Sequence, residues 1–152
     1  MEQDPFAAVP LRNIADPRLQ ALYDYWNMKR GDRLAPGYQD LDGLDRPEWR
    51  GHLSLLEVLE AGRDFRYQVY GGALAVYYGR DLTGKTTRHL ARPVGDLVRR
   101  EYAQASVGGH PVLVERRRRI RGLRIMVVKL ILPLSTDEHT IDMLLAGSYP
   151  HP

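Results

Sequence analysis

The opening part of the chain carries one run of apolar residues at helical spacing. The run recurs at intervals of three and four residues, as one face of a helix does: Leu19, Leu22, Tyr23 and Trp26. Asp16 is a residue type that caps a helix start, Pro17 suits the first turn, and Gly31 suits a helix end. The pattern therefore predicts a helix over residues 16–31.

Beyond this helix, the pattern changes to the alternation that is typical of strands. The predicted elements are two strands, short helices, a longer helix and three more strands, over 53–60, 65–70, 73–78, 80–90, 93–107, 111–121, 124–134 and 141–146. The second strand alternates most clearly. One face carries Phe65, Tyr67 and Val69, and the other carries Arg66, Gln68 and Tyr70. Residues 124–134 are nearly all apolar, which predicts a central strand.

This order of elements predicts a single α+β domain. A length of 152 residues suits one domain, and the sequence contains no internal repeat. We expect an N-terminal tail over 1–15, the domain over 16–149 and a C-terminal tail over 150–152. Within the domain, the helix 16–31 precedes a core over 53–149.

Several local sequences resemble one known family. Val69–Leu74 ends a strand in two glycines and enters a helix, and Tyr78–Lys85 continues with a glycine-bounded turn. Leu132–Ser135 precedes a polar turn and the last strand, and Tyr25-Trp26 lies in the leading helix. Over residues 16–149 the chain resembles the compact, stand-alone PAS-domain proteins of alphaproteobacteria.

The PAS resemblance implies both a fold and a class of function. The implied fold is a five-stranded antiparallel sheet in the spatial order 2-1-5-4-3, with short helices on one face and the N-terminal helix outside the core. The implied function is bacterial signal transduction by a sensory or adaptor domain, not an enzyme. Such a domain acts through a partner, for example a signalling kinase, and can also bind a small molecule.

The same resemblance places a mixed apolar and tyrosine-lined cavity between the sheet and the helices of residues 73–107. The expected ligand-binding residues are Tyr67, Val69, Leu74, Tyr78, Leu97, Tyr102, Met126 and Met143. Core packing explains the tyrosines equally well. A pure adaptor whose interior is filled by these side chains is therefore the alternative.

Composition excludes several kinds of chemistry. The chain has no cysteine, which removes disulfides, thiolate zinc sites and iron–sulfur clusters. The first ten residues include Glu2 and Asp4 and lack the apolar run of a secretory signal. No stretch approaches the roughly 18 apolar residues of a membrane span. We therefore expect a cytoplasmic protein with no membrane partner.

The basic run Arg116–Arg119 allows two interpretations. It could bind a phosphate or a nucleic acid, and the net charge of +3 permits such a partner without demanding it. On a strand, however, Arg116 and Arg118 point to one face and the other two arginines to the opposite face. The favoured interpretation is a solvated strand end that discourages pairing at the sheet edge. Nucleic-acid binding is disfavoured because no aromatic residues interleave the run.

No catalytic or metal-binding motif occurs. The five histidines lack the spacing of a metal-binding pair, and an ordinary exposed histidine is the favoured interpretation even for His89, which borders the expected cavity. Haem-binding PAS domains usually hold a histidine on the longer helix, and this helix has none. We therefore predict no metal and no cofactor. The alternative enzyme would be a small α+β cone fold using acid–base chemistry on an apolar substrate, which needs a buried Asp or Glu beside a histidine or tyrosine.

The leading helix also favours a homodimer. Its apolar stripe can cover the domain's own sheet or that of a partner. Tyr25 and Met28 lie off the stripe and give the helix a second, partly apolar side, which is more than a lone surface helix needs. The predicted dimerisation residues are Trp26, Tyr25 and Leu22.

Overall fold

The computed structural model describes residues 11 and 14–151 of the chain. The helices in this part are α1 (Pro17–Arg30), α2 (Gly72–Tyr78) and α3 (Val94–Gly108), with 3-10 turns η2 (Tyr38–Asp40), η3 (Glu60–Gly62) and η4 (Thr87–His89). The strands are β1 (Leu53–Leu59), β2 (Asp64–Val69), β3 (Val112–Ile120), β4 (Leu123–Leu134) and β5 (Met143–His151). The hydrophobic pattern therefore predicted each of these helices and strands, with differences at their ends that are largest for β5.

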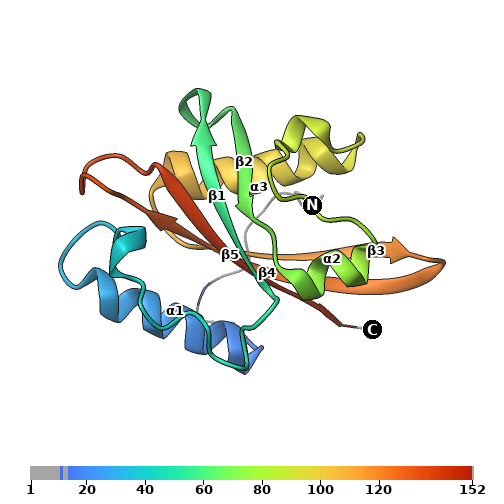
Figure 1. The fold of residues 1–152 in the computed structure, drawn as a ribbon, viewed down its shortest axis with the longest axis horizontal. Coiled ribbons are helices and arrows are strands. Elements are labelled where there is room, and N and C mark those ends of the chain that lie inside the picture. Colours follow the sequence, from blue (N-terminus) through green and yellow to red (C-terminus); the bar gives the residue numbers. More distant parts are fainter. Residues whose placement is uncertain (1–10, 12–13, 152) are drawn as a thin grey trace, which may run out of the picture.

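The five strands form one antiparallel sheet in the order β2-β1-β5-β4-β3 (Figure 1). The predicted fold class and spatial order are confirmed. Strand β5 lies in the centre, where it joins the β1-β2 hairpin to the β3-β4 hairpin. The two faces of the sheet are covered by different helices. Gly147 of β5, which pairs with Leu130 of β4, approaches α1. Lys129 is adjacent to Leu130, so its side chain points to the opposite face of the sheet, where it contacts Glu101 of α3.

Helix α1 packs against the sheet through the predicted apolar stripe. Leu19 and Leu22 are fully buried, and the Trp26 indole Nε1 donates a hydrogen bond of 2.8 Å to the carbonyl oxygen of Pro133 on β4. A Cβ atom on Gly147 would lie 2.8 Å from Leu22 Cδ2, so the glycine allows the helix to approach β5 closely. The stripe covers the domain's own sheet. The assignment of Leu22 and Trp26 to a dimer interface is therefore corrected, because both side chains are buried within the chain.

The second side of α1 contacts the loop that follows it. The Tyr25 ring packs against Trp49 at a centroid distance of 5.6 Å. The Tyr25 hydroxyl donates to Asp42 Oδ1 at 3.3 Å and accepts from the Gly43 amide at 3.0 Å. Met28 on this helix is 66% exposed. These contacts explain why Tyr25 departs from the stripe, and the homodimer itself stays a prediction.

The two predicted tails differ in outcome. The predicted N-terminal tail 1–15 lies mostly outside the described residues, which include only residues 11, 14 and 15 of it. The C-terminal tail 150–152 is corrected, because β5 continues to His151, which pairs with Met126. Strand β4 is long enough to offer its backbone to β5 well beyond the expected end of that strand at residue 146.

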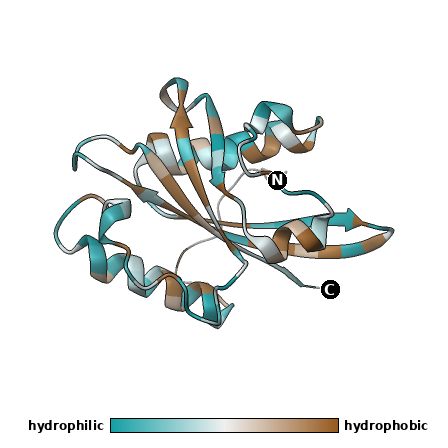
Figure 2. Cartoon of the chain, in the orientation of Figure 1, coloured by the Kyte–Doolittle hydropathy of each residue, from teal (hydrophilic) through white to brown (hydrophobic). Residues whose placement is uncertain are grey.

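Hydrophobic residues gather on the strands, as Figure 2 shows. On β4, Leu130, Ile131, Leu132 and Leu134 are fully buried, in agreement with the prediction of an interior strand. Across residues 14–151, no helix has both the length and the hydropathy needed to cross a membrane.

Candidate functional site

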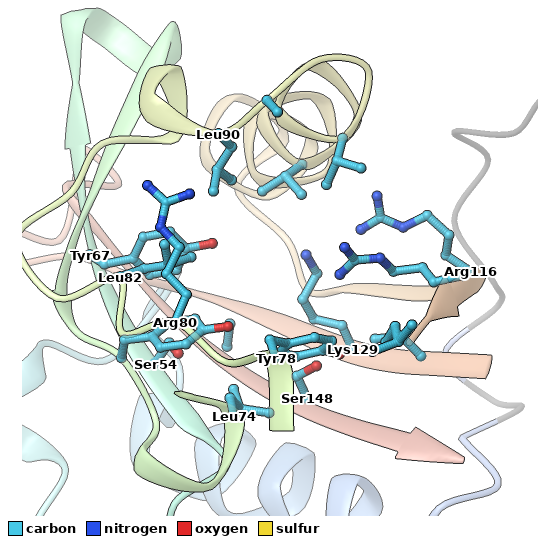
Figure 3. A pocket seen from close by; sticks show the side chains of 18 of the residues that line it. Ser54, Tyr67, Leu74, Tyr78, Arg80, Leu82, Leu90, Arg116, Lys129 and Ser148 are labelled. Atoms are coloured by element: carbon cyan, nitrogen blue, oxygen red, sulfur yellow. The ribbon is translucent and has the colours of Figure 1, made fainter. Parts of the chain in front are cut away.

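A cavity of about 470 Å³ lies between the sheet and helices α2 and α3 (Figure 3). Ala146 and Ser148 of β5 and Lys129 of β4 line it on the sheet side. Val94 and Val98, one helical turn apart on α3, line it from the helix side. Its volume falls within the range of about 300–1,000 Å³ that is usual for small-molecule sites.

Half of the predicted ligand-binding residues line this cavity: Tyr67, Leu74, Tyr78 and Tyr102. The other half lie outside the lining: Val69, Leu97, Met126 and Met143. The prediction assigned the two methionines to the wrong face of the sheet. Met126 is adjacent to the lining residue Val127, and Met143 is three positions from the lining residue Ala146, so alternation turns both methionines toward the α1 side.

Val69 and Leu97 miss the cavity for local reasons. The pairing of β1 with β2 shifts between Leu55 and Leu56, so Tyr67 points inward while Val69 is 50% exposed. A bulge of this kind breaks the simple alternation from which Val69 was assigned. On α3, Leu97 is adjacent to the lining residue Val98, and neighbouring helix positions point in different directions.

A cluster of tyrosines forms a buried part of the cavity wall. The hydroxyl oxygens of Tyr67 on β2 and Tyr102 on α3 are 2.9 Å apart, and both side chains are buried. Burial raises the pKa of Tyr67 to about 12 and the pKa of Tyr102 well above its ordinary value. The Tyr70 ring lies 5.2 Å from that of Tyr67, and burial raises its pKa as well. These phenols are therefore neutral hydrogen-bonding groups in the cavity wall.

A buried group of three charged residues connects α3 to the sheet. Glu101 of α3 is 4% exposed. Its Oε1 atom accepts from Arg116 Nη2 at 2.9 Å and lies 2.8 Å from Lys129 Nζ. Two cations thus share one carboxylate, and the group carries one net positive charge.

Of the two cations in this group, Lys129 is the more deeply buried. Its side chain is 8% exposed, and its Nζ lies 4.5 Å from the centroid of the Tyr102 ring. Burial lowers the pKa of Lys129, and the charge of Glu101 partly offsets that effect. The ammonium therefore depends on Glu101 and on the face of the aromatic ring to remain charged in the interior.

The basic run contributes to the cavity. Arg116, Arg118 and Arg119 line it, and Arg117 does not. Alternation on β3 predicts the first two, whereas Arg119 was expected on the opposite face. The Arg118 guanidinium lies 5.2 Å from the centroid of the Tyr78 ring. The favoured interpretation of a solvated strand end is wrong for Arg116, whose side chain is only 16% exposed. The sequence does indicate this burial, because alternation along β3 places Arg116 on the same buried face as Val112.

The remaining candidate groups lie outside the cavity. His89 is exposed, and its Nδ1 is 2.9 Å from the Thr86 hydroxyl oxygen. Among the described residues, no three or more His, Asp or Glu side chains gather as metal ligands would. The lining, as far as the structure describes it, contains no Asp, Glu or His. The acid–base enzyme considered above needs such a group in the cavity, and the buried Glu101 is instead held by two cations.

The sheet order and the helices that enclose a cavity on one face define an α+β domain with a five-stranded antiparallel sheet. A family model described as a PAS domain matches residues 14–149, and the chain belongs to this family. PAS domains are generally sensory, signalling-type modules. No curated protein and no solved structure matches the chain significantly.

Proposed function

We propose that this protein is a sensory domain that binds a small molecule in the cavity beneath α3 and passes the binding signal to a partner protein. The observation that carries the proposal is the cavity of about 470 Å³, whose lining combines apolar side chains with hydroxyl and cationic groups. Sites of this kind use apolar surface for affinity and a few polar groups for orientation.

Helix α3 is the element on which such a signal would act. It supplies Val94, Val98 and Tyr102 to the cavity lining. The same helix is held to the sheet by Glu101, through its ion pairs with Arg116 and Lys129. A ligand in the cavity therefore contacts a helix whose attachment to the sheet depends on polar groups beside the ligand.

The test is a thermal-shift screen of the purified protein against a panel of acidic, basic and neutral small molecules. A ligand at 100 times its Kd stabilises the folded state by about 2.7 kcal/mol. For a domain of this size, that raises Tm by roughly 5–10 °C. The variant Val98→Phe places a larger side chain into the cavity and is expected to abolish the shift.

The matched control is Val107→Phe, which changes a residue of the same helix that is 74% exposed. It is expected to keep the full thermal shift. A shift that survives in Val98→Phe would place the ligand outside the cavity. Absence of any shift across the panel would leave a domain that acts only through protein contacts.

The proposed output is a protein–protein contact, either in a homodimer or with a signalling kinase. Support comes from the family, whose members commonly mediate interactions, and from two exposed apolar side chains, Val76 on α2 (78% exposed) and Met28 on α1 (66% exposed). Light scattering across a concentration series tests the homodimer. A mass that stays at the 17.4 kDa of one chain would contradict it and leave a separate partner.

A further inference from the structure

The Arg116 guanidinium has hydrogen-bond donors that the protein does not use. Its Nη2 atom donates to Glu101, whereas Nε and Nη1 are buried and have no partner among the described residues. In a guanidinium these two atoms carry one and two N–H groups, respectively. Leaving charged donors unpaired in a protein interior is unfavourable. Arg116 is a lining residue of the cavity, so a small shift of its side chain would offer these N–H groups to a ligand group that accepts several hydrogen bonds.

The charge of the cavity favours the same kind of group. Arg116 and Lys129 share the single carboxylate of Glu101, which leaves one positive charge unbalanced. Of the described residues that line the cavity, none is acidic and seven are basic: Arg80, Arg92, Arg116, Arg118, Arg119, Arg121 and Lys129. An unbalanced positive charge with little solvent around it attracts an anion more strongly than the same charge in water.

The rest of the lining favours an organic molecule over an inorganic ion. Apolar side chains from three elements and from the segment between α2 and α3 line the cavity: Leu74, Leu82, Leu90, Val94, Val98 and Val127. Figure 3 shows Arg116 and Lys129 on one side of the cavity, with Tyr67, Leu82 and Arg80 on the other. A ligand that contacts both sides needs an acidic group at one end and an apolar body at the other.

We infer that the cavity binds an organic carboxylate, whose acidic group accepts hydrogen bonds from Arg116 next to Lys129 and whose apolar body lies against α2 and α3. This inference rests on the proposed function of small-molecule binding. A carboxylate matches the site in two ways. Its two coplanar oxygens fit the donor geometry of a guanidinium, and its single charge balances the buried group. A phosphate monoester carries close to two charges, one more than the group of Glu101, Arg116 and Lys129 balances by itself.

The experiment compares molecules of nearly the same shape, one of each pair charged and the other neutral. Isothermal titration measures the binding of 1-naphthoate and hexanoate, and of the neutral amides 1-naphthamide and hexanamide. We expect each carboxylate to bind roughly tenfold or more tightly than its amide, because charge-assisted hydrogen bonds are about twice as strong as neutral ones. Phenyl phosphate and benzoate form a further pair, of which benzoate is expected to bind more tightly.

Three variants assign the effect to the buried charges. Arg116→Gln is expected to weaken carboxylate binding by about tenfold while leaving amide binding unchanged. The matched control Arg117→Gln changes an exposed arginine outside the cavity lining and should alter neither. Glu101→Gln removes the internal carboxylate and should strengthen carboxylate binding. If Arg116→Gln does not fold, Arg116→Lys, which keeps the charge without the planar donors, carries the test with a smaller loss.

The outcomes separate this inference from the proposed function. If carboxylates and amides bind equally and Val98→Phe abolishes both, the cavity is a ligand site but the inferred preference for a carboxylate is overturned. Tighter binding of phenyl phosphate than of benzoate would also overturn it. Unchanged carboxylate affinity in both Arg116 variants would place the acidic group elsewhere. Failure of all probes to bind the folded protein would overturn the inference, while the wider thermal-shift panel would still decide the proposed function.

Discussion

The hydroxyl oxygen of Tyr67 on β2 lies 2.9 Å from that of Tyr102 on α3. Both side chains are buried, and each hydroxyl has the other as its hydrogen-bonding neighbour in the cavity wall. This contact ties an edge strand of the sheet to the helix that covers it. The Tyr102 ring also packs edge-on against Phe65 at a centroid distance of 5.5 Å, so the hydroxyl pair lies within an aromatic cluster.

Replacing one phenol of this pair is expected to cost more than replacing both. Tyr102→Phe leaves the Tyr67 hydroxyl buried without its partner, which should lower the free energy of unfolding by about 1–3 kcal/mol. The double variant Tyr67→Phe/Tyr102→Phe removes both polar groups and should recover part of this loss. Urea unfolding of the two single variants and the double variant gives the coupling energy. Strictly additive losses would show that the pair is not coupled.

The folded protein is expected to lose stability in alkaline solution through Tyr67. Burial raises the pKa of Tyr67 to about 12 in the folded state, above the value of about 10 for an unfolded tyrosine. A raised folded-state pKa means that the stabilising contribution is complete below pH 10 and is lost as the pH rises toward 12. Urea unfolding across this interval should show a fall of about 3 kcal/mol from this group.

The double variant Tyr67→Phe/Tyr102→Phe is the control for this pH dependence. It retains the other titrating groups, including Tyr149, whose pKa burial also raises to about 12. Its stability should therefore fall less steeply than that of the wild type over the same interval. Parallel curves for the two proteins would assign the alkaline loss to groups other than the buried pair.

The buried group around Glu101 should respond very differently to the loss of one charge and to the loss of all three. Glu101→Ala leaves Arg116 and Lys129 without their shared carboxylate and should lower the free energy of unfolding by about 3–5 kcal/mol. The triple variant Glu101→Leu/Arg116→Met/Lys129→Met has no buried charge at these positions and is expected to lie close to the wild type.

Denaturant unfolding of both variants tests this expectation, with Glu115→Ala as the control at an exposed position of β3. The control should stay within about 0.5 kcal/mol of the wild type. A small effect of Glu101→Ala would mean that the two cations reach solvent or lose their charge when the carboxylate is removed.

The contact between α1 and the sheet predicts a cost for even one added methyl group. Gly147→Ala places a Cβ atom 2.8 Å from Leu22 Cδ2 and 3.1 Å from Leu19 Cδ2. The resulting displacement of α1 should destabilise the protein by about 1–3 kcal/mol. Gly72→Ala is the control, because its Cβ atom meets nothing within 4 Å. An equal effect of the two substitutions on Tm would show that α1 does not need the glycine.

The sequence predicted the fold well because the relevant signals are local. Alternation marks the strands, and the stripe at Leu19, Leu22 and Trp26 marks both the helix and the face that it buries. The strand order came from a family resemblance instead of periodicity. Nothing local indicates that β5 extends to His151, since that depends on the length of the strand beside it.

The candidate site was predicted only in part, for reasons that differ between its members. Tyr67 and Tyr102 could be placed from their strand and helix phase. Val69 could not, because a bulge is a property of two paired strands. The ion pairs of Glu101 could not be predicted either, because a single acidic residue on a helix does not indicate that two cations from β3 and β4 contact it. Contacts between distant segments decide such sites.

Strand β5 separates the cavity on one face of the sheet from helix α1 on the other face. Ala146 and Ser148 face the cavity, and Gly147 between them touches Leu22 of α1. A movement of this stretch of backbone toward or away from the cavity therefore changes its fit against α1 on the reverse side. The interior and the outer helix are mechanically joined through three consecutive residues, and the side chain in the middle of the three is a hydrogen atom.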